Sequence, residues 1–143
     1  GDHRDLHSFP TRRSSDLKEL MIQFCIAYRS ILAKHTLSAT NATGKQVIEA
    51  TGLPISLYMG RNQGGGQQVS ARIAYNEVDL LIYFTDPNSP GDAFQDPFLL
   101  EILRLCDQHN VPVATNLATA EMLILGLERG DLDWRDVAKS KKL

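Results

Sequence analysis

The stretch LSATNATGKQV at residues 37–47 decides how the rest of the chain is organised. A short apolar run ends at Ala39, a turn with two hydroxyls and an amide follows, and Gly44 opens a segment with helical character. A strand that turns through small polar residues into a helix presents unpaired backbone N–H groups and the positive end of the helix dipole, which suits a phosphate or a carboxylate. Thr and Asn also cap ordinary helices, and the turn taken alone favours that simpler interpretation.

Segments with strand and helix character alternate on both sides of this turn. The clearest strand is residues 78–85, whose continuous apolar run is typical of a parallel strand covered on both faces. Such alternation implies right-handed crossovers. We therefore expect an α/β fold with three layers, a mostly parallel twisted sheet with helices on both faces. Helices are expected at 18–32, 44–51, 67–76, 97–109, 118–127 and 132–138, and further strands at 37–39, 54–59 and 111–114.

Composition excludes several classes of function. The chain has 143 residues, 43% of them hydrophobic, and a net charge of −2, so no basic surface indicates a nucleic-acid partner. No run of eighteen apolar residues could span a membrane. Cys25 and Cys106 both lie in apolar, helix-like segments without metal-ligand spacing, which indicates reduced core thiols in a cytoplasmic protein and no metal site.

The first residues differ in character from the rest. Residues 1–17 are polar and aperiodic, and they lack the apolar segment of a signal peptide. The segment LHSFPTRRSSDL within them resembles a translated sequencing adapter. We therefore expect residues 1–17 to be a non-native leader, poorly ordered or extended, and residues 18–143 to form the domain.

Four polar loops follow the expected strands. They are residues 40–44, 60–66, Asp86 with the loop after it, and 115–116. In parallel sheets, ligands bind where the carboxyl ends of the strands meet their loops. The known nucleotide motifs do not fit, since Gln46 follows Gly44-Lys45 where a P-loop has Ser or Thr.

Several motifs together resemble the methylglyoxal synthase family. They run from Lys18 to about Asp131 and comprise LSATNATG at 37–44, ATG at 50–52, GGGQQV at 64–69, FTDP at 84–87 and VPVATNLATA at 111–120. The resemblance implies a small α/β domain, usually a homohexamer, that converts dihydroxyacetone phosphate to methylglyoxal and inorganic phosphate without metal or cofactor. The same fold serves as a regulatory ligand-binding domain in large carbamoyl phosphate synthetases.

The resemblance assigns roles to individual positions. Lys18 matches a phosphate-contacting lysine, and Asp86 matches an active-site aspartate. A Ser-Gly pair of the family becomes Gly60-Arg61, where the arginine either grips phosphate through its guanidinium or lies solvated on the surface. The phosphate cradle of the family, Thr-Gly-Thr-Thr, becomes Thr40, Asn41, Ala42 and Thr43.

At several positions this chain lacks the catalytic residues of the family. In the family an aspartate takes a proton next to the substrate carbonyl, and the resulting enediolate expels phosphate; Gly66 stands at that position. A general base of this kind contributes roughly 10²–10⁴-fold to the rate. A histidine that polarises the substrate oxygen aligns with Gln95, and a nearby aspartate becomes Phe98. A His-Asp pair that ends the first strand of the family falls at Ser14-Ser15.

Two hypotheses follow. The first is a divergent methylglyoxal synthase in which Asp86, Asp92 or Asp96 becomes the base and Gln95 donates to the enediolate oxygen. The second is a module that binds a phosphorylated ligand and performs no turnover. In either case, replacement of the first strand would remove a parallel strand from the sheet and expose an apolar edge.

Overall fold

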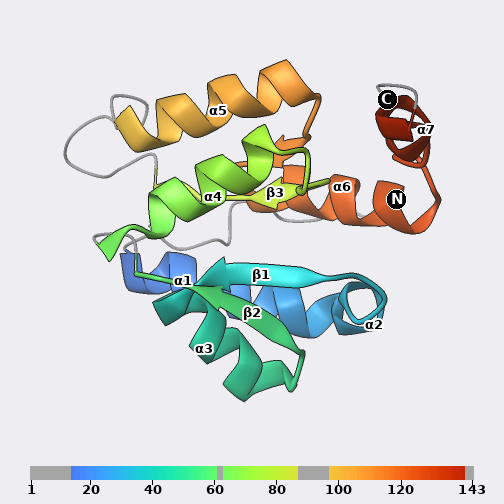
Figure 1. Ribbon diagram of the computed structural model, residues 1–143. Helices are drawn as coiled ribbons and strands as arrows, with labels where there is room; N and C mark the ends of the chain where they lie inside the picture. The colour runs from blue at the N-terminus through green and yellow to red at the C-terminus, as the bar shows by residue number, and fades with distance from the viewer. Residues whose placement is uncertain (1–13, 61–62, 87–96, 141–143) are drawn as a thin grey trace.

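The computed structural model describes residues 14–60, 63–86 and 97–140 (Figure 1). Helices and strands alternate along this part of the chain, as expected, and the strands pair in parallel. The helices are α1 (Ser14–Ala27), α2 (Arg29–Leu32), α3 (Asn41–Thr51), α4 (Gly65–Ala74), α5 (Pro97–His109), α6 (Leu117–Glu128) and α7 (Trp134–Ser140). The strands are β1 (Leu37–Thr40), β2 (Ile55–Tyr58), β3 (Leu81–Ile82) and β4 (Val113–Ala114).

Local sequence signals account for several helix boundaries. α5 begins at Pro97, where proline costs nothing because the first helical N–H has no partner in the helix. α3 ends at Gly52, whose φ of 72° is the left-handed conformation that favours glycine. α6 begins after Asn116, whose side-chain oxygen accepts a hydrogen bond from the backbone N–H of Thr119 at 3.0 Å.

The sheet is divided into two parallel pairs, whereas we expected one sheet. In the first half-sheet β1 pairs with β2, with Leu37 opposite Ile55 and Thr40 opposite Tyr58. In the second, β3 pairs with β4. The strand expected at residues 78–85 is regular only over Leu81–Ile82. A strand is held by its neighbours, and β3 has a hydrogen-bonded neighbour on one edge only among the described strands.

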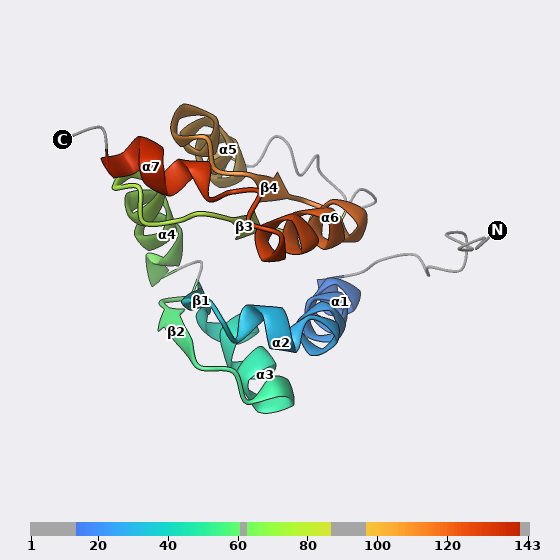
Figure 2. The same ribbon diagram turned by 90° about the vertical axis from the view of Figure 1, so that its right-hand side faces the viewer.

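Two apolar cores lie on opposite faces of the strands and give the three layers. One core packs α1, α3 and α6 against side chains that include Ile82 and Phe84. The other packs α4 and α5 against Leu81 and Val113. Figure 2 shows α1 and α6 on one side of the strands and α4 and α5 on the other. Neighbouring residues of the β3 segment thus face different layers, as the alternation of strand side chains requires.

The first helix corrects the expectation for residues 1–17. Ser14 to Leu17 form the first turn of α1 and are therefore neither extended nor irregular. Asp16 in that turn is favourable, because a carboxylate near a helix N-terminus interacts well with the helix dipole. Residues 1–13 lie outside the described residues.

The two cysteines are free and buried, as predicted. Burial raises the pKa of the Cys25 thiol to about 11. The pKa of Cys106 is also raised to about 11, mainly by burial and further by the carboxylate of Asp107. Within the described part of the chain, no helix is long and apolar enough to cross a membrane.

Candidate functional site

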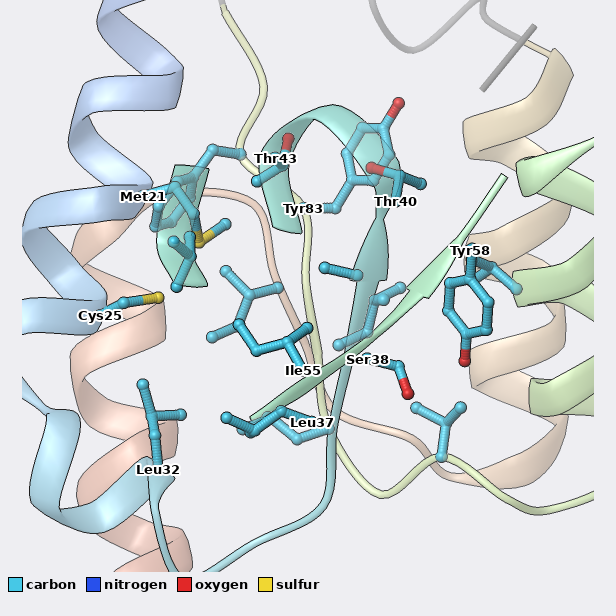
Figure 3. A pocket seen from close by; sticks show the side chains of 18 of the residues that line it. Met21, Cys25, Leu32, Leu37, Ser38, Thr40, Thr43, Ile55, Tyr58 and Tyr83 are labelled. Carbon is cyan, nitrogen blue, oxygen red and sulfur yellow. The ribbon is translucent and has the colours of Figure 1, made fainter. Parts of the chain in front are cut away.

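A cavity of about 1030 Å³ opens between the two half-sheets and extends to the strand ends that carry the expected cradle. Figure 3 shows Thr40, Thr43 and Tyr83 at one end of it and Leu32 and Leu37 at the other. The first end carries hydroxyl groups, and the lining near the second includes Lys34, His35 and Thr36 beside the two leucines. The lining comes from β1, β2 and the β3 segment, together with side chains of α1, α4, α5 and α6.

The cradle residues form the junction of β1 and α3. Thr40 is the N-cap of α3, with φ −65° and ψ 154°, yet its side chain makes no capping hydrogen bond. Asn41, Ala42 and Thr43 form the first helical turn, whose N–H groups have no carbonyl partner in the helix. An uncapped helix N-terminus has the geometry and the electrostatics that suit an anion, and Thr40, Ala42 and Thr43 line the cavity.

The cradle differs from the expectation in one respect. α3 begins at Asn41, so Gly44 lies inside the helix and does not open it. Gly44 is buried, and a Cβ there would lie 2.3 Å from Leu57 Cδ2 and 3.2 Å from Ala39 Cβ. Glycine is needed because α3 packs closely on both strands of its half-sheet, which fixes the position of the cradle.

Other predicted binding residues are placed only in part. Lys18 lies on α1, is exposed, and lines the cavity, and Gly60 lines it after the end of β2. Asp86 is half-buried just beyond the end of β3. The remaining predicted positions, Arg61, Asp92, Gln95 and Asp96, lie outside the described residues.

Gly66 is buried beside an aromatic ring. A Cβ at Gly66 would lie 2.1 Å from Cε2 and 2.6 Å from Cδ2 of Phe98. The Phe98 ring in turn packs on Tyr83, with ring centroids 6.2 Å apart. The room beside Gly66, where the resemblance places a catalytic carboxylate, is therefore taken by the side chain of Phe98. The two departures from the family pattern, Gly66 and Phe98, thus lie in direct contact.

Tyr83 and Arg72 are two of the many lining residues that were not predicted from the sequence. Tyr83 belongs to an apolar run that indicated a core strand, yet it lies at the cradle end of the cavity (Figure 3). Arg72 on α4 lines the cavity, lies over the Tyr58 ring at 5.9 Å and pairs with Glu77 at 2.6 Å. The position of Tyr83 in a strand and of Arg72 in a helix does not predict that they line the cavity, because both side chains reach it through tertiary packing.

The described residues contain no group of three or more His, Cys, Asp or Glu side chains that could hold a metal ion.

Comparison with known proteins places the chain in a family. The sequence model of the MGS-like domain matches residues 20–115. Methylglyoxal synthase of Caldicellulosiruptor saccharolyticus is 50% identical over 124 residues, which cover 87% of this chain and 86% of that relative. Methylglyoxal synthase of Brevibacillus brevis is 45% identical over 125 residues, which cover 87% and 90%.

A solved structure agrees with these sequence matches. The crystal structure of methylglyoxal synthase from Elizabethkingia anophelis NUHP1 superposes with a TM-score of 0.65 at 33% identity, covering 75% of this chain and 69% of the other. The α/β fold thus has a counterpart in a solved structure. The chain belongs to the methylglyoxal synthase family.

Proposed function

We propose that this chain is a methylglyoxal synthase-type lyase acting on dihydroxyacetone phosphate, with a weakened chemical step. The phosphate binds at Thr40–Thr43, and Lys18 contributes positive charge. In keeping with the resemblance, the enzyme works as a cytoplasmic homohexamer without metal or organic cofactor.

The single observation that carries the binding half of this proposal is the uncapped N-terminus of α3. Thr40 is a good N-cap residue, but its hydroxyl is not used to cap the helix, although it lies at the mouth of the cavity. Hydrogen bonds from neutral donors to a charged group contribute about 1.5–3 kcal/mol each. An anion held by this turn accepts the hydrogen bonds that a capping side chain would accept, so binding of the anion also stabilises the start of α3.

The chemical half assigns the base to Asp86. Its carboxylate removes a proton from the carbon next to the substrate carbonyl, which gives an enediolate. The enediolate then expels inorganic phosphate by cleavage of the carbon–oxygen bond, and the enol that remains becomes methylglyoxal. Since Gly66 supplies no carboxylate and Asp86 stands at another position, we expect the rate to lie below that of a site with the base in its family position.

A second function, ligand binding without turnover, is favoured by one specific observation. The Phe98 ring fills the room beside Gly66, which suits an apolar wall against a bound ligand better than a proton-transfer site. In this case the chain senses a phosphorylated ligand in the manner of the regulatory domains that share the fold.

One pair of measurements on the same preparation separates the two functions. Calorimetric titration with dihydroxyacetone phosphate measures binding, and a phosphate-release assay with detection of methylglyoxal measures turnover. The lyase proposal predicts saturable binding and slow release of both products in equal amounts. Binding without release would establish the second function, and the absence of binding would overturn both.

A further inference from the structure

Tyr83 brings a further hydroxyl group to the end of the cavity that carries the cradle. Figure 3 shows its ring directed toward the same end as the hydroxyls of Thr40 and Thr43, and these residues line the cavity together. Tyr58 also lines the cavity, but its hydroxyl is directed away from Thr40 (Figure 3). Of these two tyrosines, Tyr83 is therefore the one whose hydroxyl faces a ligand held by the cradle.

The alternation of strand side chains places Tyr83 and Thr40 on the same face of the strands. Leu81 packs in the core of α4 and α5, so Tyr83, two residues further along the same segment, faces that layer too. In the other half-sheet Thr40 lies opposite Tyr58, whose ring lies under the guanidinium of Arg72 on α4. Residues directly opposite each other in paired strands share a face, so Thr40 also points toward the layer of α4.

The Tyr83 ring is held in place, whereas its hydroxyl is free. The backbone N–H of Tyr83 donates to the carbonyl of Ala114 at 2.8 Å, and the ring packs against Phe98 with centroids 6.2 Å apart. Within the described part of the chain, no hydrogen bond engages the hydroxyl of this half-buried residue. Buried tyrosine hydroxyls usually have a partner, so a fixed ring with a free hydroxyl is suited to a ligand oxygen.

We propose that the Tyr83 hydroxyl donates a hydrogen bond to the carbonyl oxygen of the triose phosphate whose phosphate is held at Thr40–Thr43. When Asp86 removes the proton from the neighbouring carbon, negative charge develops on this oxygen, which then accepts the hydrogen bond more strongly. Tyr83 keeps its own proton throughout, so the proton balance and the products are unchanged. Tyr83 thus shares the role that the sequence assigns to Gln95, which lies outside the described residues. This assignment rests on the proposed function and adds a catalytic residue to it.

The aromatic neighbour of Tyr83 strengthens this hydrogen bond. Phe98 fills the room beside Gly66 and forms an apolar wall against the Tyr83 ring. A hydrogen bond to a charged oxygen is stronger where the surroundings are apolar and water is excluded. The same substitutions that leave Gly66 without a carboxylate therefore favour stabilisation of the enediolate by a neutral donor.

Removal of a single hydroxyl tests this role. Tyr83→Phe keeps the ring and its packing on Phe98, and it removes no hydrogen bond between described residues, so we expect the variant to fold with unchanged stability. The matched control is Tyr58→Phe, which removes a hydroxyl from the same cavity that is directed away from the cradle. Two probes divide the site: inorganic phosphate fits the cradle alone, and 2-phosphoglycolate adds a carboxylate where the enediolate oxygen forms.

The expected result is a selective loss. In Tyr83→Phe, kcat for phosphate release should fall by roughly 10²–10³-fold with little change in KM, because the lost hydrogen bond is strongest in the transition state. The affinity for 2-phosphoglycolate, measured by calorimetry, should fall about tenfold. The affinity for inorganic phosphate should stay the same, and Tyr58→Phe should change none of these quantities.

The contrary results separate this role from the proposed function. Unchanged affinity for 2-phosphoglycolate in Tyr83→Phe, or unchanged kcat in an active enzyme, would overturn the role of Tyr83 and leave the lyase proposal standing. Equal losses for both probes would also overturn it, because Tyr83 would then belong to the phosphate cradle. A wild-type chain without turnover whose affinity for 2-phosphoglycolate depends on the Tyr83 hydroxyl would confirm the hydrogen bond and overturn the lyase proposal. A wild-type chain that binds neither probe would overturn both.

Discussion

Two parts of the molecule differ in how well they suit the reaction of the family. At Thr40–Thr43 the backbone turn, the hydroxyls and the uncapped helix N-terminus are in place. At Gly66 the carboxylate is absent, and Phe98 fills the room it would need. The proposed function therefore places binding and chemistry on separate parts of the structure, since the cradle is built by β1 and α3 and the family's base position by the packing of α4 on α5.

The strongest test of this separation is removal of the proposed base. Asp86→Asn keeps the shape of the side chain and removes its basicity, so we expect phosphate release to fall by roughly 10²–10⁴-fold. Dihydroxyacetone phosphate should bind no more weakly, because the cradle is untouched. Steady-state release assays and calorimetry measure the two quantities. The control is Asp107→Asn, an exposed carboxylate on α5; unchanged release in Asp86→Asn would remove Asp86 from the mechanism.

Restoring the carboxylate tests the coupling between Gly66 and Phe98. Gly66→Asp alone forces a side chain into the Phe98 ring, and overpacking of this kind costs about 1–3 kcal/mol in the free energy of unfolding. Combining it with Phe98→Ala makes room, so the double variant should unfold at higher denaturant than additivity predicts and release phosphate faster than wild type. Additive stabilities in the double-mutant cycle would show that the two positions are independent.

The sequence predicts several local features of the fold, but it does not predict the contact between Gly66 and Phe98. The bounds of α5 follow from Pro97 and from apolar periodicity. Residue types also predict the strand-to-helix junction near Thr40, although the helix begins at Asn41 and not at Gly44. The contact between Gly66 and Phe98 joins two helices distant in sequence, so local pattern could not predict it.

The length of a strand also depends on residues distant in the sequence. The apolar run at residues 78–85 predicts a long buried strand, but regular pairing covers only Leu81–Ile82, because strand geometry needs partners on its edges. Helix α1 gives the opposite case. Its first turn at Ser14 to Leu17 forms although the polar character of these residues indicated an irregular leader.

The cradle itself is tested by removing a single hydroxyl. Thr40→Val keeps the branched shape, and we expect affinity for dihydroxyacetone phosphate and for inorganic phosphate to fall about tenfold, the equivalent of one charge-assisted hydrogen bond. Stability without ligand should stay the same, because Thr40 makes no capping bond. Thr36→Val, at an exposed position before β1, is the matched control. Equal affinities in the two variants would contradict the assignment.

The smallest expected effect concerns the second strand-to-helix turn. Asn116 caps α6, so Asn116→Ala should lower the free energy of unfolding by about 1 kcal/mol and leave phosphate affinity unchanged. Chemical denaturation and calorimetry show both quantities. The pattern is the reverse of that expected for Thr40→Val, and a loss of affinity in Asn116→Ala would mean that both turns bind the ligand.

The most direct test of the separation between binding and chemistry is one titration of the wild-type chain with dihydroxyacetone phosphate, in which heat of binding and released phosphate are followed together. Our account predicts saturable binding that Thr40→Val weakens, with phosphate released slowly and only while Asp86 is present. Phosphate release that persists undiminished in Asp86→Asn, or binding that Thr40→Val does not change, would contradict it.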